Sequence, residues 1–411
     1  RLAEELDSRI MVILMHWEGS APWAPPYVWP PYGGEETFGE YVDALHKAGQ
    51  LIGVYCSGLG WTQHSNVVPE YDMHEKFERE QLAEVMCTAP DGSLPLSKIC
   101  SAQRSGYDMC PATEFCVSTV ADEVAKTVGG GVDYIQVLDQ NHGGTPYFCY
   151  SDRHNHPPVP GKWQTDAMKS LLARLEEHTC AGGRRVLLGC ESAAAETYIP
   201  QLLFSDNRYE LNYGIGKPTP VYAYVYHEYV NNFMGNQVCA QYIFDHDRSP
   251  ENLMLRIAHA FIAGDMLTVV IDQDGEICWN WGQLENKTAP DRAAVTGFIR
   301  RLNGWRRECA KFLHTGKMTE PTELCCEGEN EIYLMCGYRH KFGKILTSAW
   351  TAADGDFAQF AVNYNTENVA VFAPCGVTVT NTPGGEEKLY AAGERFSVPA
   401  LSAVMIKRSG K

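Results

Sequence analysis

Short apolar runs alternate with amphipathic segments along the first three-quarters of the chain, and this alternation narrows the possible folds more than any other feature. The run at 10–14 is followed by apolar residues at helical spacing over 38–45 and then by a second run at 51–55. The same order returns around 134–138 and 186–188. Strands that alternate with helices indicate a parallel sheet whose faces are covered by the helices.

Two further apolar runs, 221–226 and 267–271, raise the number of predicted strands to six, and 210–213 is a candidate seventh. Elements in this order are expected to close into a barrel. A doubly wound open sheet is the alternative, but no GxGxxG or GxxxxGK(S/T) motif follows any of the runs. We therefore predict an α/β fold with a (β/α)8 TIM-type barrel over residues 1–316, either complete or lacking its first strand in this chain.

From about residue 317 the pattern changes to short β-type runs separated by Gly, Asn, Asp and Pro. No segment with a helical period separates these runs. They lie at 332–335, 360–362, 369–372, 377–379 and 403–406. We predict a C-terminal antiparallel β-sandwich domain over residues 317–411.

The net charge of the chain limits the classes of partner that it can bind. Its 411 residues include 34 Lys and Arg against 51 Asp and Glu, for a net charge of −17, and no basic run is longer than two residues. Such a chain repels a phosphate backbone, so no nucleic-acid partner is expected. No run approaches the roughly 18 apolar residues of a membrane helix, and no signal-peptide pattern opens the chain, so no membrane partner is expected either.

The fifteen cysteines are spread from Cys56 to Cys375 without a CxxC pair. We predict buried thiols that pack as small apolar side chains, and neither a zinc site nor a redox centre. Free thiols favour a cytoplasmic location over secretion, although a chain without an initial Met can have lost a leader. Asp152, His154 and His156 have the spacing of metal ligands, but no further ligand lies near them in their proline-flanked loop, so we expect no metal and no cofactor.

Carboxylates follow the predicted strands directly. In a parallel barrel the active site forms at the carboxyl ends of the strands, so these side chains are the first candidates for chemistry. Several acids in one barrel mouth suit glycoside hydrolysis, which uses one carboxylate and one carboxylic acid. The acids at predicted strand ends are Glu18, Asp139, Glu191, Glu228 and Asp272.

Aromatic residues gather in the same loops, among them Trp17, Tyr55 and Trp279. Each one can equally fill the interior of a loop, but together they are typical of platforms on which sugar rings stack. We therefore expect a carbohydrate substrate.

Five segments stand out for their combination of acids, aromatic residues and glycines. They are His16-Trp17-Glu18-Gly19, Pro31-Tyr32-Gly33-Gly34, 134–139, 190–196 and 224–229. These segments resemble a bacterial glycoside-hydrolase-like family of uncharacterised function, related to the endo-α-N-acetylgalactosaminidase and α-N-acetylgalactosaminidase families. The resemblance extends over most of residues 1 to about 315.

The resemblance implies a retaining glycoside hydrolase that cleaves an α-linked galactose- or N-acetylgalactosamine-type bond. In the related enzymes an Asp at the end of the fourth strand is the nucleophile and a Glu at the end of the fifth is the acid/base. If the run at 10–14 is the second strand, these positions are Asp139 and Glu191. An inverting glycosidase, a non-catalytic carbohydrate-binding protein on a hydrolase-like barrel and a metal-dependent barrel enzyme remain the alternatives.

Further polar residues are candidates for binding substrate hydroxyls. For His142 a role in loop structure is an equal alternative, and for Asp206 with Arg208 an internal ion pair is the alternative. The full set predicted to bind substrate is Trp17, Glu18, Tyr55, His142, Asp206, Arg208, His227, Glu228, Asp272 and Trp279.

Overall fold

The computed structural model describes residues 1–139, 147–207, 218–235, 245, 247–272, 274–277, 291–334 and 337–408. The chain forms two compact units, Arg9–Ser205 and a second unit that combines Arg1–Ser8 with Asp206–Lys411. The predicted boundary at residue 316 falls inside the second unit, where the antiparallel strands begin at Lys317, and the division into 1–316 and 317–411 stays a prediction. No helix among the described residues is long and apolar enough to cross a membrane.

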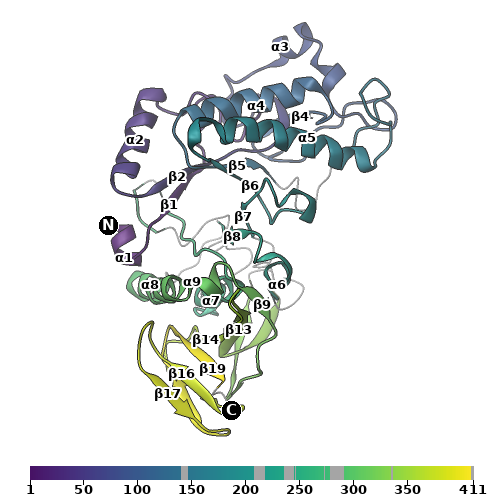
Figure 1. Ribbon diagram of the computed structural model, residues 1–411. Coiled ribbons are helices and arrows are strands. Elements are labelled where there is room, and N and C mark those ends of the chain that lie inside the picture. The colour runs from purple at the N-terminus through teal and green to yellow at the C-terminus, as the bar shows by residue number, and fades with distance from the viewer. Residues whose placement is uncertain are drawn as a thin grey trace. The chain divides into compact units, whose positions relative to one another are not determined.

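A four-stranded parallel sheet forms the centre of the first unit (Figure 1). Its strands, in spatial and sequence order, are β1 (Met11–Leu14), β2 (Leu51–Tyr55), β5 (Tyr134–Leu138) and β6 (Leu187–Cys190). The helices along this stretch are α2 (Glu35–Lys47), α4 (Glu114–Gly129) and α5 (Lys162–Thr179), of which α4 and α5 lie side by side. The predicted βαβ pattern of this half is thereby confirmed.

Leu188 of β6 makes a further parallel bridge with Leu202, so the parallel order continues beyond β6. Closure into an eight-stranded barrel is not seen among the described residues and stays a prediction.

Two glycines let the central strand β5 pack closely. Tyr134, the first residue of β5, is completely buried and lies opposite Gly53 of β2. A Cβ atom on Gly53 would lie 2.7 Å from the ring of Tyr134, and one on Gly189 of β6 would collide with its hydroxyl. Because glycine carries no side chain, both neighbouring strands leave room for this ring.

The amino ends of the sheet are tied together by one carboxylate. Asp133, directly before β5, accepts hydrogen bonds from the Ile52 N–H at 2.9 Å and from His46 at 2.8 Å. Its other oxygen lies 3.2 Å from the Arg184 guanidinium. The segments that lead into three successive strands therefore share one anchor at this edge.

An antiparallel excursion, not predicted from the sequence, separates β2 from α4. It consists of β3 (Gly60–Ser65), α3 (His74–Arg79), the 3₁₀ helix η1 (Leu82–Val85) and β4 (Arg104–Asp108). Trp61 and Arg104 are among its fully buried side chains, and Phe77 stacks on Tyr107 with ring centroids 5.3 Å apart. The excursion thus has a small core of its own.

The remaining α-helices lie in the second unit, and two short 3₁₀ helices, η2 and η3, lie in the first. The helix predicted after Pro250 is α7, which is buried along its whole length, and the one predicted around 295–302 is α8. The other described elements before residue 317 are α1 (Leu2–Leu6), η2 (Ala181–Gly183), η3 (Glu196–Tyr198), β7 (Phe204–Asp206), α6 (Val221–Tyr226), β8 (Asn231–Phe233), α7 (Asn252–Ala263), α8 (Arg292–Glu308) and α9 (Ala310–Leu313).

The predicted strand at 221–226 is wrong, because this run forms α6. Pro220 directly precedes it, and the fixed φ of proline suits a helix start. The rings of Tyr222 and Tyr226, one turn apart, then pack with their centroids 5.0 Å apart. Val221 and Val225 are exposed, so no sheet takes up the β-branched side chains that favoured a strand.

The predicted strand at 267–271 is also wrong. Met266 makes a parallel bridge with Phe233 of β8, and the chain then continues without strand pairing until Ile271 bridges Ile277. The candidate strand at 210–213 lies outside the described residues.

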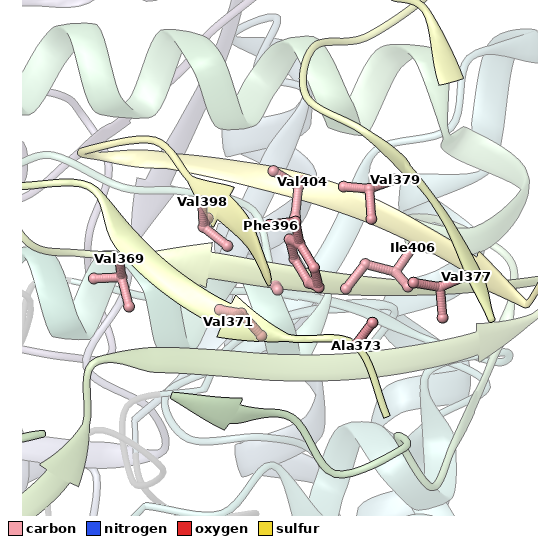
Figure 2. Packing of buried hydrophobic residues seen from close by; sticks show 10 residues of the cluster. Val369, Val371, Ala373, Val377, Val379, Phe396, Val398, Val404 and Ile406 are labelled. Carbon is pink, nitrogen blue, oxygen red and sulfur yellow. The ribbon is translucent and has the colours of Figure 1, made fainter. Parts of the chain in front are cut away.

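Two antiparallel sheets make up the C-terminal part of the second unit, as predicted. One has the order β17-β16-β19-β14-β13-β9 and the other β10-β15-β18, with β11 and β12 as a separate hairpin. Figure 2 shows valine, alanine and isoleucine side chains from both sheets gathered around Phe396, so the two sheets share one core. The strands are β9 (Lys317–Thr319), β10 (Cys325–Cys326), β11 (Glu329–Tyr333), β12 (Arg339–Gly343), β13 (Ile345–Thr351), β14 (Phe357–Asn363), β15 (Val369–Phe372), β16 (Val377–Thr380), β17 (Glu387–Tyr390), β18 (Arg395–Val398) and β19 (Ser402–Arg408).

Candidate active site

Three polar side chains stand at the carboxyl ends of three neighbouring strands. Tyr55 is the last residue of β2, Asp139 follows β5 and Glu191 follows β6. The Glu191 N–H donates to the Leu138 carbonyl at 2.8 Å, which continues the ladder one step beyond β6. Parallel pairing therefore brings residues distant in the sequence to one edge of the sheet.

The Tyr55 hydroxyl joins the two predicted catalytic acids. Its oxygen lies 3.0 Å from Asp139 Oδ2 and 2.8 Å from Glu191 Oε2. These two carboxyl oxygens therefore lie within about 6 Å of one another, given two ordinary hydrogen-bond lengths. All three side chains are buried. The structure thus brings together the pair predicted from strand ends and adds a phenol between them.

The Tyr55 hydroxyl has one hydrogen and two carboxyl neighbours. A phenol has one hydrogen, and one hydrogen cannot form two straight bonds to different oxygens. Burial raises the pKa of Tyr55 well above its usual value, and the charges of Glu191 and Asp139 raise it further, so the phenol keeps its proton. The phenol hydrogen is therefore shared between the two acids or given to one of them at a time.

The Cys100 thiol lies beside one of the two acids. Its thiol donates toward Asp139 Oδ2 at 3.7 Å. Burial, reinforced by the charge of Asp139, raises the pKa of this thiol to about 12, so it remains a donor. A donor stabilises the ionised form of the carboxyl group that it faces. Sequence reasoning missed Cys100, because it lies in an irregular segment before β4 with no motif around it.

Trp17 contacts the backbone of Tyr55. Its indole N–H donates to the Tyr55 carbonyl at 2.7 Å, and its ring packs against Trp29 and Phe38. Only 4% of Trp17 is exposed, so its ring face is covered by protein. In this structure it holds the backbone of Tyr55 in place.

Glu18 is a buried acid beside Trp17. Its Oε1 accepts the Trp23 N–H at 3.3 Å, and its Oε2 has no hydrogen-bond partner among the described residues. Burial raises the pKa of Glu18 to about 7. The carboxyl group therefore holds its proton well above the usual range.

The raised pKa of Glu18 predicts a pH dependence of stability. Between about pH 4.5 and 7 the unfolded carboxyl group is ionised while the folded one keeps its proton, so the free energy of unfolding falls as the pH rises, by up to about 3 kcal/mol. Glu18→Gln should flatten this fall and stabilise the protein above pH 7. Urea unfolding at pH 5 and pH 8 measures it, with Glu36→Gln, at an exposed position of α2, as control. Identical pH slopes for wild type and Glu18→Gln would contradict the prediction.

Four other predicted residues lie in the described part of the second unit. His227 is buried, its Nδ1 lies 3.0 Å from the Gly316 carbonyl, and its ring packs 4.5 Å from Trp350. Glu228 is exposed and follows α6, so the strand-end argument for both residues is wrong. Their substrate-binding role has no further support.

Asp272 and Asp206 differ in their surroundings. Asp272 is exposed, and its carboxylate accepts the N–H groups of Asp274 and Glu276 at 3.0 Å each, which closes a turn. Asp206 is buried at the end of β7, a strand that was not predicted from the sequence, and its substrate-binding role stays a prediction. The remaining predicted residues, His142, Arg208 and Trp279, lie outside the described residues.

Solved structures with a similar fold include glycoside hydrolases. The α-N-acetylgalactosaminidase NagBb of Bifidobacterium bifidum matches with a TM-score of 0.55 and 14% identity, over 88% of this chain and 49% of that one. A GH27 β-L-arabinopyranosidase of Geobacillus stearothermophilus matches with a TM-score of 0.51 and 11% identity, over 99% and 89% of the two chains. The α-amylase of H. orenii matches with a TM-score of 0.55 and 12% identity, over 97% and 90%.

At these identities the likeness shows a shared fold. The chain spans about half the length of the Bifidobacterium enzyme. No curated protein sequence matches the chain.

The sequence profile of a domain of unknown function, DUF6259, matches residues 1–236. The matched segment is more than half of the chain and contains Tyr55, Asp139 and Glu191. It also includes the strand-end segments on which the resemblance to an uncharacterised glycoside-hydrolase-like family rests, and that resemblance is confirmed. The protein that places two acids on one tyrosine hydroxyl is thus a member of the DUF6259 family.

Proposed function

We propose that this protein is a retaining glycoside hydrolase in which Asp139 is the nucleophile and Glu191 the acid/base. The observation that carries the proposal is the shared hydrogen bonding of both acids to the Tyr55 hydroxyl at the carboxyl edge of a parallel sheet. Retaining enzymes hold their two carboxyl groups about 5–5.5 Å apart, whereas inverting enzymes need about 6.5–9.5 Å to admit a water molecule. Two acids on one phenol oxygen fit the shorter separation.

We take the roles of the two acids from the strand-end resemblance. Asp139 lies near the Cys100 thiol as well as the phenol, and a nearby donor favours the ionised form that a nucleophile needs. Glu191 is the acid/base, the group that gives a proton to the glycosidic oxygen. An ionised Asp139 can attack carbon, and a protonated Glu191 can protonate a leaving oxygen.

The reaction proceeds in two steps. Asp139 attacks the anomeric carbon while Glu191 gives its proton to the glycosidic oxygen, so the leaving alcohol departs and a glycosyl ester of Asp139 forms. Glu191, now ionised, removes a proton from water as that water attacks the same carbon. The ester bond breaks, Asp139 is released as a carboxylate, and the sugar leaves with its original anomeric configuration.

For the substrate we propose an α-linked galactose- or N-acetylgalactosamine-type sugar. Support comes from the strand-end resemblance and from the fold shared with an α-N-acetylgalactosaminidase. The chain is expected to complete a (β/α)8 barrel around the site, as TIM-barrel glycosidases with C-terminal β-domains do.

A panel of aryl glycosides tests the proposed function. Hydrolysis of α-N-acetylgalactosaminide or α-galactoside, with NMR showing retention at the anomeric carbon, supports it. Hydrolysis with inversion would remove the nucleophilic role of Asp139. Sugar binding by calorimetry without turnover of any member would instead support a carbohydrate-binding protein on a hydrolase-like fold.

Tyr55→Phe tests the positioning role of the phenol. The variant keeps the ring and removes the shared hydroxyl, so we expect kcat to fall roughly 10- to 100-fold, the equivalent of one or two buried hydrogen bonds, with little change in KM. Steady-state kinetics measures this split. Tyr41→Phe, on the outer side of α2, is the matched control and should behave as wild type. A Tyr55→Phe variant with wild-type kcat would show that the bridge plays no part in turnover.

A further inference from the structure

A second cluster of reactive side chains lies in the first unit, apart from the two acids. The ligand atoms of Cys110, Cys149, His154 and His156 all lie within 4.8 Å of one another. Cys110 lies just after β4, and the other three lie in the segment that leads to α5. Both thiols are completely buried, and both imidazoles are partly buried.

The imidazoles are oriented by backbone carbonyls. His154 Nε2 lies 2.8 Å from the Glu84 carbonyl, and His156 Nδ1 lies 2.7 Å from the Pro157 carbonyl. A carbonyl only accepts, so each of these nitrogens carries the hydrogen and the opposite nitrogen of each ring has a free lone pair.

Those opposite nitrogens face the thiols. His154 Nδ1 lies 3.3 Å from Cys149 Sγ, and His156 Nε2 lies 3.4 Å from Cys110 Sγ. The His156 ring is held in this orientation by stacking on Trp163, with centroids 3.6 Å apart and an interplanar angle of 4°. Metal-bound histidines typically donate their other ring N–H to a carbonyl, which fixes the tautomer in this way.

We propose that Cys110, Cys149, His154 and His156 bind one zinc ion in a closed tetrahedral site. Two thiolates and two imidazoles are a ligand set that zinc prefers, and a site with four protein ligands is structural rather than catalytic. With Zn–S near 2.3 Å and Zn–N near 2.0–2.1 Å, a tetrahedron separates sulfur from nitrogen by about 3.6 Å. The two observed S···N distances are close to this value. Binding releases the two thiol protons to solvent as the thiolates form.

A third thiol stands next to the cluster. The Cys87 side chain lies within hydrogen-bonding reach of both Cys110 and Cys149. It is not one of the four groups that are mutually close, so it belongs to the surroundings of the ion in this proposal. Replacing Cys87 by serine distinguishes a site with two cysteine and two histidine ligands from a site with three cysteine ligands.

The zinc ion would join two parts of the first unit. Cys110 and the Glu84 carbonyl belong to the excursion between β2 and α4, whereas Cys149 and the histidines follow β5 in the sequence. The site would therefore fasten the segment after Asp139 to the excursion. The metal-ligand spacing of His154 and His156 is visible in the sequence, but no metal was expected there, because the chain has no CxxC pair and Cys110 is distant from the histidines along the chain.

Metal analysis of the purified full-length chain tests the proposal without reference to activity. We expect about one zinc per chain after dialysis against zinc and then metal-free buffer, as for a tight structural site. Cys110→Ser and His154→Ala should lose most of the metal, whereas Cys180→Ser, at an exposed position, and Cys87→Ser should keep it. Wild type without stoichiometric metal, or ligand variants with wild-type content, would overturn the site. Loss in Cys87→Ser with retention in His156→Ala would overturn this ligand set.

A second measurement avoids variants that fail to fold. Wild type reconstituted with Co²⁺ should show the visible bands of a tetrahedral ion together with a thiolate charge-transfer band, and a chelator should lower its Tm until zinc is restored. Octahedral cobalt without thiolate bands would overturn the proposal. If the protein hydrolyses glycosides but binds no zinc, only this inference is overturned. If it binds zinc but hydrolyses no glycoside, only the proposed function is overturned.

Discussion

Asp139→Ala is expected to lower kcat/KM by roughly 10⁴-fold or more, because no covalent intermediate can form without the nucleophile. The loss should appear with every leaving group, since Asp139 acts on the sugar carbon in the first step. Initial rates on the best aryl glycoside measure it. Asp122→Ala, at an exposed position of α4, is the matched control and should keep wild-type rates.

Azide identifies the role of Asp139 more sharply than the loss of rate. The space left by the shortened side chain admits a small anion, which can attack the anomeric carbon directly. The product should then be a glycosyl azide of inverted configuration, because only one displacement takes place. Undiminished turnover in Asp139→Ala, or rescue with retained configuration, would exclude Asp139 as the nucleophile.

Glu191→Ala is expected to have a large effect that depends on the leaving group. Glycosides of poorly acidic alcohols need a proton on the leaving oxygen, so their kcat/KM should fall roughly 10²- to 10⁴-fold. Activated aryl glycosides leave without that proton and should be affected far less in the first step. A series of leaving groups measures the difference as a slope.

The control for Glu191 is Glu177→Ala, at an exposed position of α5, which should show the wild-type slope. In Glu191→Ala the alkaline limb of the pH–rate profile should also disappear, because the group that must be protonated is gone. Azide should now give a glycosyl azide of retained configuration, since it replaces water in the second step. An equal loss on all leaving groups, with an unchanged pH profile, would remove Glu191 from the acid/base role.

The two acids could be predicted from the sequence because the signal is local. Each follows a continuous apolar run bounded by turn residues, and parallel strands end at one edge of their sheet whatever lies between them. The strands at 51–55 and 134–138 were bounded correctly for the same reason. The rule depends on a correct strand assignment, and it led to wrong positions where 221–226 formed a helix instead.

The features that were missed depend on contacts between distant segments. The strand Gly60–Ser65 is almost wholly buried although most of its residues are polar, so its sequence lacks the apolar run that marked the others. Cys100 reaches Asp139, and Cys110 reaches Cys149, only once that excursion has folded. No spacing along the chain encodes these meetings, because they are set by the packing of the excursion against the segment after β5.

The two ends of the parallel sheet have different roles. At the amino ends of the strands, Asp133 contacts Ile52, His46 and Arg184 and fixes the segments that lead into the strands. The carboxyl ends carry Tyr55, Asp139 and Glu191. Substitutions in the loops that follow the strands can therefore alter the surroundings of the two acids, while the contacts of Asp133 keep the strands in register. Changes in the site and the stability of the sheet would then depend on different residues, which do not contact one another.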